Sequence, residues 1–117
     1  MLRSAVKIGQ NWCAADDGAT FAVINPATGE KLGEVPMCGA AETRRAIAAA
    51  NEAWPAWRAL TARQRAQLLR AWFELIIQNT EDLARLITAE CGKPLTEARG
   101  EVAYGASFIE WFAEEGK

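Results

Sequence analysis

The sequence contains no histidine and only three cysteines, and both shortages limit the chemistry that the chain can perform. Histidine is the commonest general base and the commonest metal ligand. Its absence excludes a Ser-His-Asp triad, a Cys-His pair and a His-containing zinc site within one chain. Cys13, Cys38 and Cys91 are odd in number and have no CxxC spacing, which predicts reduced thiols rather than a disulfide framework. If one thiol is reactive, Cys91 is the best candidate, because it precedes a Gly-Lys-Pro turn.

Long apolar runs and basic clusters are also missing. No stretch approaches ~18 consecutive apolar residues, which predicts that the chain does not span a membrane. The N-terminus lacks the apolar core of a signal peptide, so we expect a cytoplasmic protein. The net charge is −2 and the isoelectric point is near 5.2. With no basic run, these values predict no nucleic-acid partner.

What is present divides the 117 residues into two compositions. Residues 1–38 show no helical period and contain short runs of β-forming residues separated by turn residues. They predict strands over 5–8, from 12 onwards, over 20–24 and over 31–35, with Pro36 ending the last one. The segment Asn25-Pro26-Ala27-Thr28-Gly29-Glu30 is typical of a tight turn.

Residues 39–117 are helical by their apolar period. Pro55 predicts that a first helix ends near Ala53. Thr61 and Gln64 match a capping box that begins a second helix. The pair Asn79-Thr80, followed by acids, begins a third helix, and Gly92 ends it. Pro94 opens a last helix over 95–115.

The fold class that follows is α+β, with N-terminal strands or hairpins followed by about four helices in a single partial domain over residues 1–117. We expect the larger apolar side chains of the helices to form the core. The last helix is apolar around much of its circumference, which predicts a covering neighbour, either a second copy or more polypeptide. The expected core is Trp54, Trp57, Leu69, Trp72, Phe73, Ile76, Leu83, Leu86 and Ile87; the apolar residues of the last helix are Phe108, Ile109, Trp111 and Phe112.

Few residues here carry chemistry by themselves. Neither GxGxxG nor GxxxxGK[ST] occurs, so both phosphate-binding fingerprints are absent. Acids on the last predicted helix favour a solvated face, because a hard-cation site needs further oxygen ligands. A series of arginines favours the same interpretation over a site for an anionic substrate. The acids are Glu97, Glu101, Glu110, Glu114 and Glu115, and the arginines are Arg58, Arg63, Arg65 and Arg70.

Several motifs together resemble the N-terminal segment of aldehyde dehydrogenases. They are the Asn25-Pro26-Ala27-Thr28-Gly29-Glu30 turn, the segment from Trp57 to Arg65 and Glu90-Cys91-Gly92-Lys93-Pro94-Leu95-Thr96-Glu97-Ala98. The tail from Tyr104 to Glu115, YGASFIEWFAEE, is very similar to that of bacterial succinate-semialdehyde dehydrogenases. The order and spacing of these motifs agree with those of the family over nearly the whole chain. The resemblance places the chain in part of an α/β, Rossmann-like cofactor-binding domain.

The resemblance also implies what this segment does not contain. In the family, the catalytic cysteine, the glutamate base, the oxyanion-hole asparagine and the glycine motif for the dinucleotide all come later in the chain. We therefore expect no catalytic residue, no cofactor-binding residue and no cofactor for this chain alone, and NAD or NADP for the full-length enzyme. One site is carried over from the resemblance, an incomplete monovalent-cation site. It would use the backbone carbonyl of Val23 or Ile24 and the carboxylate of Glu101.

Two functions stay open. The first is an N-terminal fragment of an NAD(P)-dependent succinate-semialdehyde dehydrogenase. That enzyme would oxidise an aldehyde to a carboxylic acid through thiolate attack, hydride transfer and thioester hydrolysis. The second is a free-standing, non-enzymatic helical module that associates with itself or with a partner. In either case we expect a homo-oligomer or association with the remainder of a dehydrogenase chain.

Overall fold

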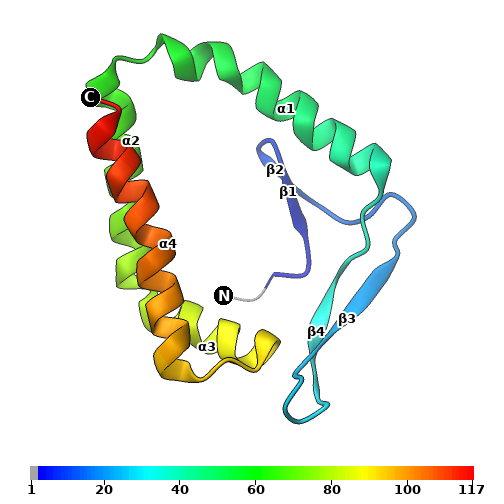
Figure 1. The fold of residues 1–117 in the computed structure, drawn as a ribbon. Coiled ribbons are helices and arrows are strands. Elements are labelled where there is room, and N and C mark those ends of the chain that lie inside the picture. Colours follow the sequence, from blue (N-terminus) through cyan, green and yellow to red (C-terminus); the bar gives the residue numbers. More distant parts are fainter. Residues whose placement is uncertain (1–2) are drawn as a thin grey trace. The chain divides into compact units, whose positions relative to one another are not determined.

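The structure is a computed structural model, and it describes residues 3–117. Two short antiparallel hairpins come first and four helices follow (Figure 1). The strands are β1 (Val6–Ile8), β2 (Asn11–Cys13), β3 (Thr20–Ile24) and β4 (Lys31–Pro36). The helices are α1 (Ala40–Ala59), α2 (Ala62–Gln78), α3 (Thr80–Cys91) and α4 (Leu95–Glu115). This is the α+β order that the sequence predicts.

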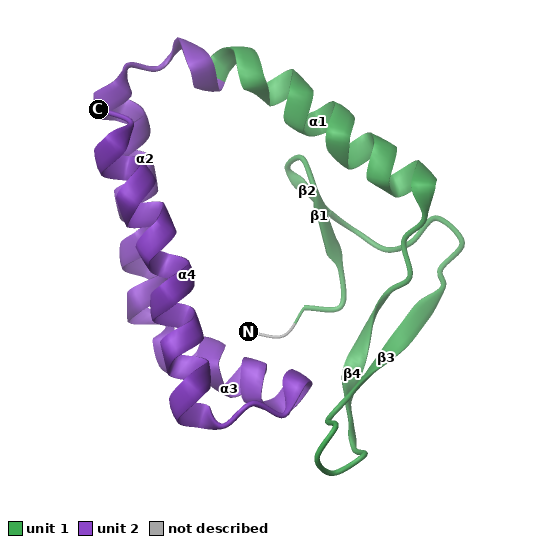
Figure 2. Cartoon of the chain, in the orientation of Figure 1, with its two compact units in different colours: residues 1–56 green, residues 57–117 purple. Residues whose placement is uncertain are grey.

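The chain forms two compact units, Met1–Ala56 (unit 1) and Trp57–Lys117 (unit 2), shown in Figure 2. The boundary falls inside α1 rather than at the change from strand to helix. The single partial domain over 1–117, with its division after residue 38, stays a prediction. Each unit is described by itself below.

Unit 1 contains both hairpins, each a separate two-stranded sheet. In the first, Val6 pairs with Cys13; in the second, Thr20 pairs with Pro36. The predicted turn between β3 and β4 is present: the N–H of Asn25 donates to the Glu30 carbonyl at 2.8 Å, and Gly29 has a φ of 75°. Glycine adopts this left-handed backbone without the steric cost that a side chain brings.

A buried carboxylate joins the loop after β2 to the start of α1. Glu42 is 6% exposed. Its oxygens accept hydrogen bonds from the N–H of Asp16 at 2.8 Å and of Gly39 at 3.0 Å. Arg45, one turn further along α1, donates two hydrogen bonds to the Asp16 carboxylate at 2.6 and 2.7 Å. These contacts fix the loop against the helix. They are needed because the two short hairpins alone bury little apolar surface.

The prediction that Pro55 ends the first helix is wrong. Proline lies inside α1, which continues to Ala59. Pro55 removes one backbone donor, which leaves the carbonyl of Asn51 without its usual partner. Asn51 is exposed, so water can satisfy that carbonyl. The proline therefore removes one hydrogen bond from a solvent-exposed turn, and the helix continues to Ala59.

Unit 2 is built from α2, α3 and α4, which pack through small residues. Ala84 and Ala98 are 0% exposed and meet between α3 and α4, with Val102 beside them. Partly buried apolar side chains surround this cluster: Ile76, Leu83, Ile87 and Leu95. Alanine at such contacts lets helix axes approach closely. The fully buried residues of this unit are therefore its smaller ones.

The predicted core was partly wrong for this reason. Trp54 is 53% exposed and Trp72 is 55% exposed, so neither is a core residue of the chain. Along α2 two apolar sets run side by side, Ala66-Leu69-Phe73-Ile76 and Leu68-Trp72-Leu75. The first set is buried or half-buried, and the second is exposed.

The start of α2, the end of α3 and the bounds of α4 follow the predicted signals. The Thr61–Gln64 capping box is formed, with the Gln64 N–H donating to Thr61 Oγ1 at 3.3 Å and the Thr61 N–H donating to Gln64 Oε1 at 2.9 Å. Gly92 ends α3 at a φ of 72°, and α4 runs over Leu95–Glu115 after Pro94. Among the described residues, no helix has both the length and the apolar character needed to cross a membrane.

Candidate functional site

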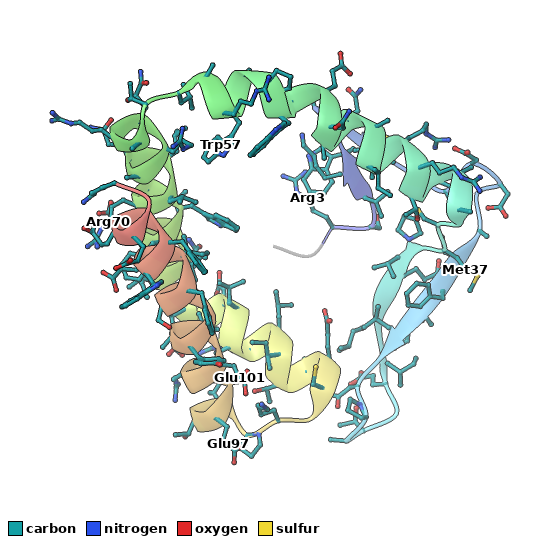
Figure 3. All side chains as sticks on the ribbon, turned by 45° about the horizontal axis from the view of Figure 1, so that its top comes forward. Arg3, Met37, Trp57, Arg70, Glu97 and Glu101 are labelled. Carbon is teal, nitrogen blue, oxygen red and sulfur yellow. The ribbon has the colours of Figure 1, made fainter. Side chains whose placement is uncertain are left out.

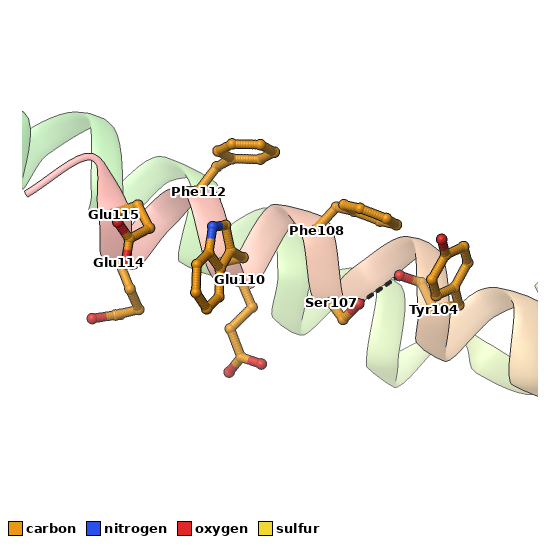
Figure 4. Close-up of a pocket in the computed structure, with 8 residues that line it drawn as sticks. Tyr104, Ser107, Phe108, Glu110, Phe112, Glu114 and Glu115 are labelled. Atoms are coloured by element: carbon orange, nitrogen blue, oxygen red, sulfur yellow. Dashed lines mark hydrogen bonds between the residues drawn. The ribbon is translucent and has the colours of Figure 1, made fainter.

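The last helix carries the most distinctive surface of unit 2. Tyr104 and Phe108 make an edge-to-face contact with their ring centroids 4.9 Å apart. Trp111 and Phe112 are 61% and 60% exposed. These rings, together with acids, line an open groove along the second half of α4 (Figure 4). Of the apolar residues named for this helix, Phe108, Trp111 and Phe112 are exposed and Ile109 is half-buried, and the covering neighbour stays a prediction.

A second apolar groove lies between α2, α3 and α4. Its lining includes two acids, Glu90 and Glu101, and Cys91. Its remaining lining is almost entirely aliphatic: Ile76, Leu83, Leu86, Ile87, Val102, Gly105, Ala106 and Ile109. Both grooves are shallow and open, so each has the character of a contact surface rather than of an enclosed active site.

Ion pairs join α2 to α4 and α3 to α4 on the polar side of these helices. Arg70 of α2 donates to Glu110 of α4 at 2.7 Å and to Glu74 of its own helix at 3.2 Å. These hydrogen bonds raise the pKa of the Arg70 guanidinium. Arg99 donates to Glu81 of α3 at 2.6 and 3.0 Å. The predicted solvated faces therefore consist partly of exposed ion pairs, each of which contributes little to stability.

The two residues of the predicted cation site lie in different units. Ile24 ends β3 and pairs with Lys31, at an irregularity in the register of the hairpin. Glu97 and Glu101 project from the first half of α4 (Figure 3), and Glu101 Oε1 accepts a hydrogen bond from Lys93 Nζ at 2.5 Å. Within residues 3–117, no three His, Cys, Asp or Glu side chains gather closely enough to hold a metal ion. The cation site stays a prediction.

The three thiols differ in their exposure. All three cysteines are free, with Cys13 and Cys38 half-buried and Cys91 exposed. Burial, and then the nearby carboxylates of Glu42 and Asp16, raise the pKa of the Cys38 thiol. A raised pKa disfavours the thiolate, which is the form that attacks a carbonyl carbon.

A dinucleotide pyrophosphate at a helix N-terminus would need unoccupied backbone N–H groups. At α1 the N–H of Gly39 donates to the Glu42 carboxylate, and at α2 the side chains of Thr61 and Gln64 form the cap. Acids occupy the first turns of α3 and α4, and they repel an anion: Glu81 and Asp82 in α3, and Glu97 in α4. That this chain alone binds neither NAD nor NADP stays a prediction.

The aldehyde dehydrogenase family profile matches residues 12–117. A glutarate-semialdehyde dehydrogenase from Pseudomonas putida is 62% identical over all 117 residues, which make up 24% of that protein. The succinate-semialdehyde dehydrogenase [NADP(+)] GabD from Escherichia coli is 59% identical, again with 100% of this chain and 24% of the relative. A crystal structure of succinate-semialdehyde dehydrogenase from Burkholderia pseudomallei has a TM-score of 0.96 and 63% identity, covering 99% of this chain and 24% of that one.

The chain belongs to the aldehyde dehydrogenase family. Within it, the chain is similar to bacterial succinate- and glutarate-semialdehyde dehydrogenases and corresponds to an N-terminal part of their NAD-binding domain. It spans about a quarter of the length of these curated relatives.

Proposed function

We propose that this chain is the N-terminal segment of an NAD(P)-dependent succinate-semialdehyde dehydrogenase and has no catalytic activity by itself. The observation that carries the proposal is identity of 59–62% over the whole chain with semialdehyde dehydrogenases that are about four times as long. The first substrate of such an enzyme would be an aldehyde with a carboxylate at its other end.

The absence of independent activity rests on the residues of this chain. Without histidine, the commonest general base is missing. Among the described residues, burial raises the pKa of the Cys38 thiol, and the side chains of Thr61 and Gln64 cap the N-terminus of α2. We therefore propose that the 117 residues alone bind neither NAD nor NADP and oxidise no semialdehyde.

A chimera tests this proposal. In it, the present chain replaces the matching first quarter of the Escherichia coli relative, with which it is 59% identical. We expect the chimera to reduce NADP⁺ with succinate semialdehyde, and the isolated chain to do so at no measurable rate. A folded chimera without activity contradicts the proposed membership of such an enzyme. Activity of the pure 117-residue chain contradicts its proposed lack of catalysis.

The full-length enzyme would be a cytoplasmic oligomer that holds a monovalent cation. The cation would bind the carbonyl of Ile24 and the carboxylate of Glu101. Because Lys93 already pairs with Glu101 Oε1, the cation and the ammonium compete for this carboxylate. If sodium raises the melting temperature of the chimera, Glu101→Gln should abolish that rise. An identical sodium response in both proteins contradicts the site.

A free-standing self-association module is the second candidate. The exposed aromatic side chains of α4 favour it, because large exposed apolar patches mark interaction surfaces. Sedimentation of the 117-residue chain over a wide concentration range tests it. A concentration-dependent dimer supports this function, and a mass of one chain at all concentrations contradicts it.

A further inference from the structure

The pair of helices α2 and α4 has two opposite faces. The hydrogen bond between Arg70 and Glu110 marks the polar face of both helices. Successive residues of an α-helix are rotated by about 100° about its axis. Residues two positions from Arg70 or Glu110 are therefore rotated by about 200° and point to the opposite side. On α2 these are Leu68 and Trp72. On α4 they are Phe108 and Phe112, which Figure 4 shows pointing away from Glu110.

This second side is apolar and open to solvent. The exposed fractions of these four side chains run from 47% for Phe108 to 60% for Phe112. Leu75 and Gly105 extend it, because they lie three residues from Trp72 and Phe108 on the same helices. We call this surface the α2–α4 apolar face; it consists of Leu68, Trp72, Leu75, Gly105, Phe108 and Phe112.

Gly105 provides a second observation about this surface. It lies in the middle of α4, where glycine costs about 1 kcal/mol relative to alanine. A Cβ at Gly105 would meet nothing within 4 Å, so no contact inside the described chain requires glycine there. A glycine in a helix interior with free space above it is suited to close approach by another backbone.

We infer that the α2–α4 apolar face is covered by that part of a full-length semialdehyde dehydrogenase polypeptide which lies outside these 117 residues. The inference rests on the proposed function and specifies the surface through which the segment joins the enzyme. The covering segment is apolar opposite these six residues, none of which is charged, and Glu101, four residues before Gly105 on the same side of α4, bounds the face. The covering segment approaches most closely at Gly105.

A second copy of the chain is a poorer occupant. A two-fold contact uses one patch of each copy. Unit 2 also exposes the aliphatic groove between α2, α3 and α4, which shares only Gly105 with the face and which such a contact would leave largely uncovered. The relatives have about three times the length of this chain in addition to the matched part, and that is enough polypeptide to cover both surfaces.

Accessibility of single cysteines tests the inference in the chimera with the Escherichia coli enzyme. Leu68→Cys places a thiol on the α2–α4 apolar face, and its neighbour Gln67→Cys places one on the polar side of the same helix. Maleimide labelling is read by mass spectrometry of the peptides, which separates these sites from the native cysteines. In the isolated chain we expect both sites to label at similar rates. In the chimera we expect Leu68→Cys to label about tenfold or more slowly than Gln67→Cys, because access then requires local opening.

A second pair on α4 guards against a variant that fails to fold: Phe112→Cys on the face and Ala103→Cys away from it. Similar labelling of both members of each pair in the chimera overturns the inference. Protection of Leu68→Cys in a dimer of the isolated chain also overturns it, since a second copy then covers the face. An inactive chimera with a protected face contradicts only the proposed function, whereas an active chimera with an accessible face contradicts only this inference.

Discussion

The two units are held together in different ways. In unit 1 the described buried residues include a carboxylate, Glu42, whose oxygens accept hydrogen bonds from two backbone N–H groups. In unit 2 the buried residues are small and apolar: Ala66, Ala84, Ala98, Val102, Ala106 and Ala113. Short hairpins bury little apolar surface, so directional polar contacts position them. Long helices can approach each other directly, so small side chains lie between them and the large ones point elsewhere.

The largest effect on stability should come from a larger side chain at the contact between α3 and α4, and it should be confined to unit 2. Ala98→Leu adds atoms where alanine is 0% exposed, and we expect a loss of about 2 kcal/mol in the free energy of unfolding of unit 2. Hydrogen exchange should quicken over residues 57–117 and stay unchanged at Asp16 and Gly39. Ala103→Leu, at an exposed position of the same helix, is the control and should stay near wild type. Equal destabilisation by both variants would contradict the packing described here.

Removing the charge of the buried Glu42 carboxylate should destabilise unit 1 and leave unit 2 unaffected. Glu42→Gln replaces an oxygen acceptor by an NH₂ group that faces a backbone N–H. We expect faster exchange at the amides of Asp16 and Gly39, with residues 57–117 unaffected. The fall in melting temperature should be smaller than for Ala98→Leu. Glu52→Gln, on an exposed turn of the same helix, is the matched control. Unchanged exchange at the two amides would refute the role of Glu42.

Acid should weaken unit 1 through the same group. Hydrogen bonds from the backbone N–H groups of Asp16, Glu42 itself and Gly39 hold the pKa of the Glu42 carboxyl below its usual value of 4.5. A lowered pKa in the folded state means that the charged carboxylate stabilises the fold above pH 4.5. That contribution is lost as the pH falls through the folded pKa. The pH dependence of the melting temperature between pH 7 and 3 (about the range where carboxyls titrate) should be shallower for Glu42→Gln than for the parent chain. Parallel curves would contradict this.

The smallest effect should come from the start of α2. Thr61→Ala removes the hydroxyl that accepts from the Gln64 N–H, and loss of an N-cap costs about 1 kcal/mol. Thr61→Ser keeps the acceptor and should restore most of the stability. Chemical denaturation followed by circular dichroism measures both variants. If Thr61→Ser is as unstable as Thr61→Ala, the cap does not explain the loss.

Sequence reasoning succeeded where a signal is local. The capping box at Thr61, the left-handed Gly92 and the bounds of α4 each depend on residues within one or two turns of the chain, and all three are present. The family resemblance was confirmed by the match over residues 12–117.

It failed where the outcome depends on distant packing. Both apolar sets of α2 have the same helical period, and the expected core combined three residues of the buried set with Trp72 of the exposed one. What decides between them is whether a helix axis can approach closely, and the small Ala66 permits this while tryptophan does not. The proposed cation site could not be judged from the sequence either, since the competing ammonium of Lys93 became evident only in the structure.

The contact of Ala84 with α4 has a consequence for natural variation of the gene. An alanine codon changes by one base only to glycine, serine, threonine, valine, proline, aspartate or glutamate codons. At a position that is 0% exposed, most of these introduce bulk, a charge or a broken helix. Selection should therefore accept mainly serine and glycine at positions 84 and 98. Missense changes at these two small residues should be rarer in populations than changes at the conspicuous aromatic residues in unit 1, such as the exposed Trp54.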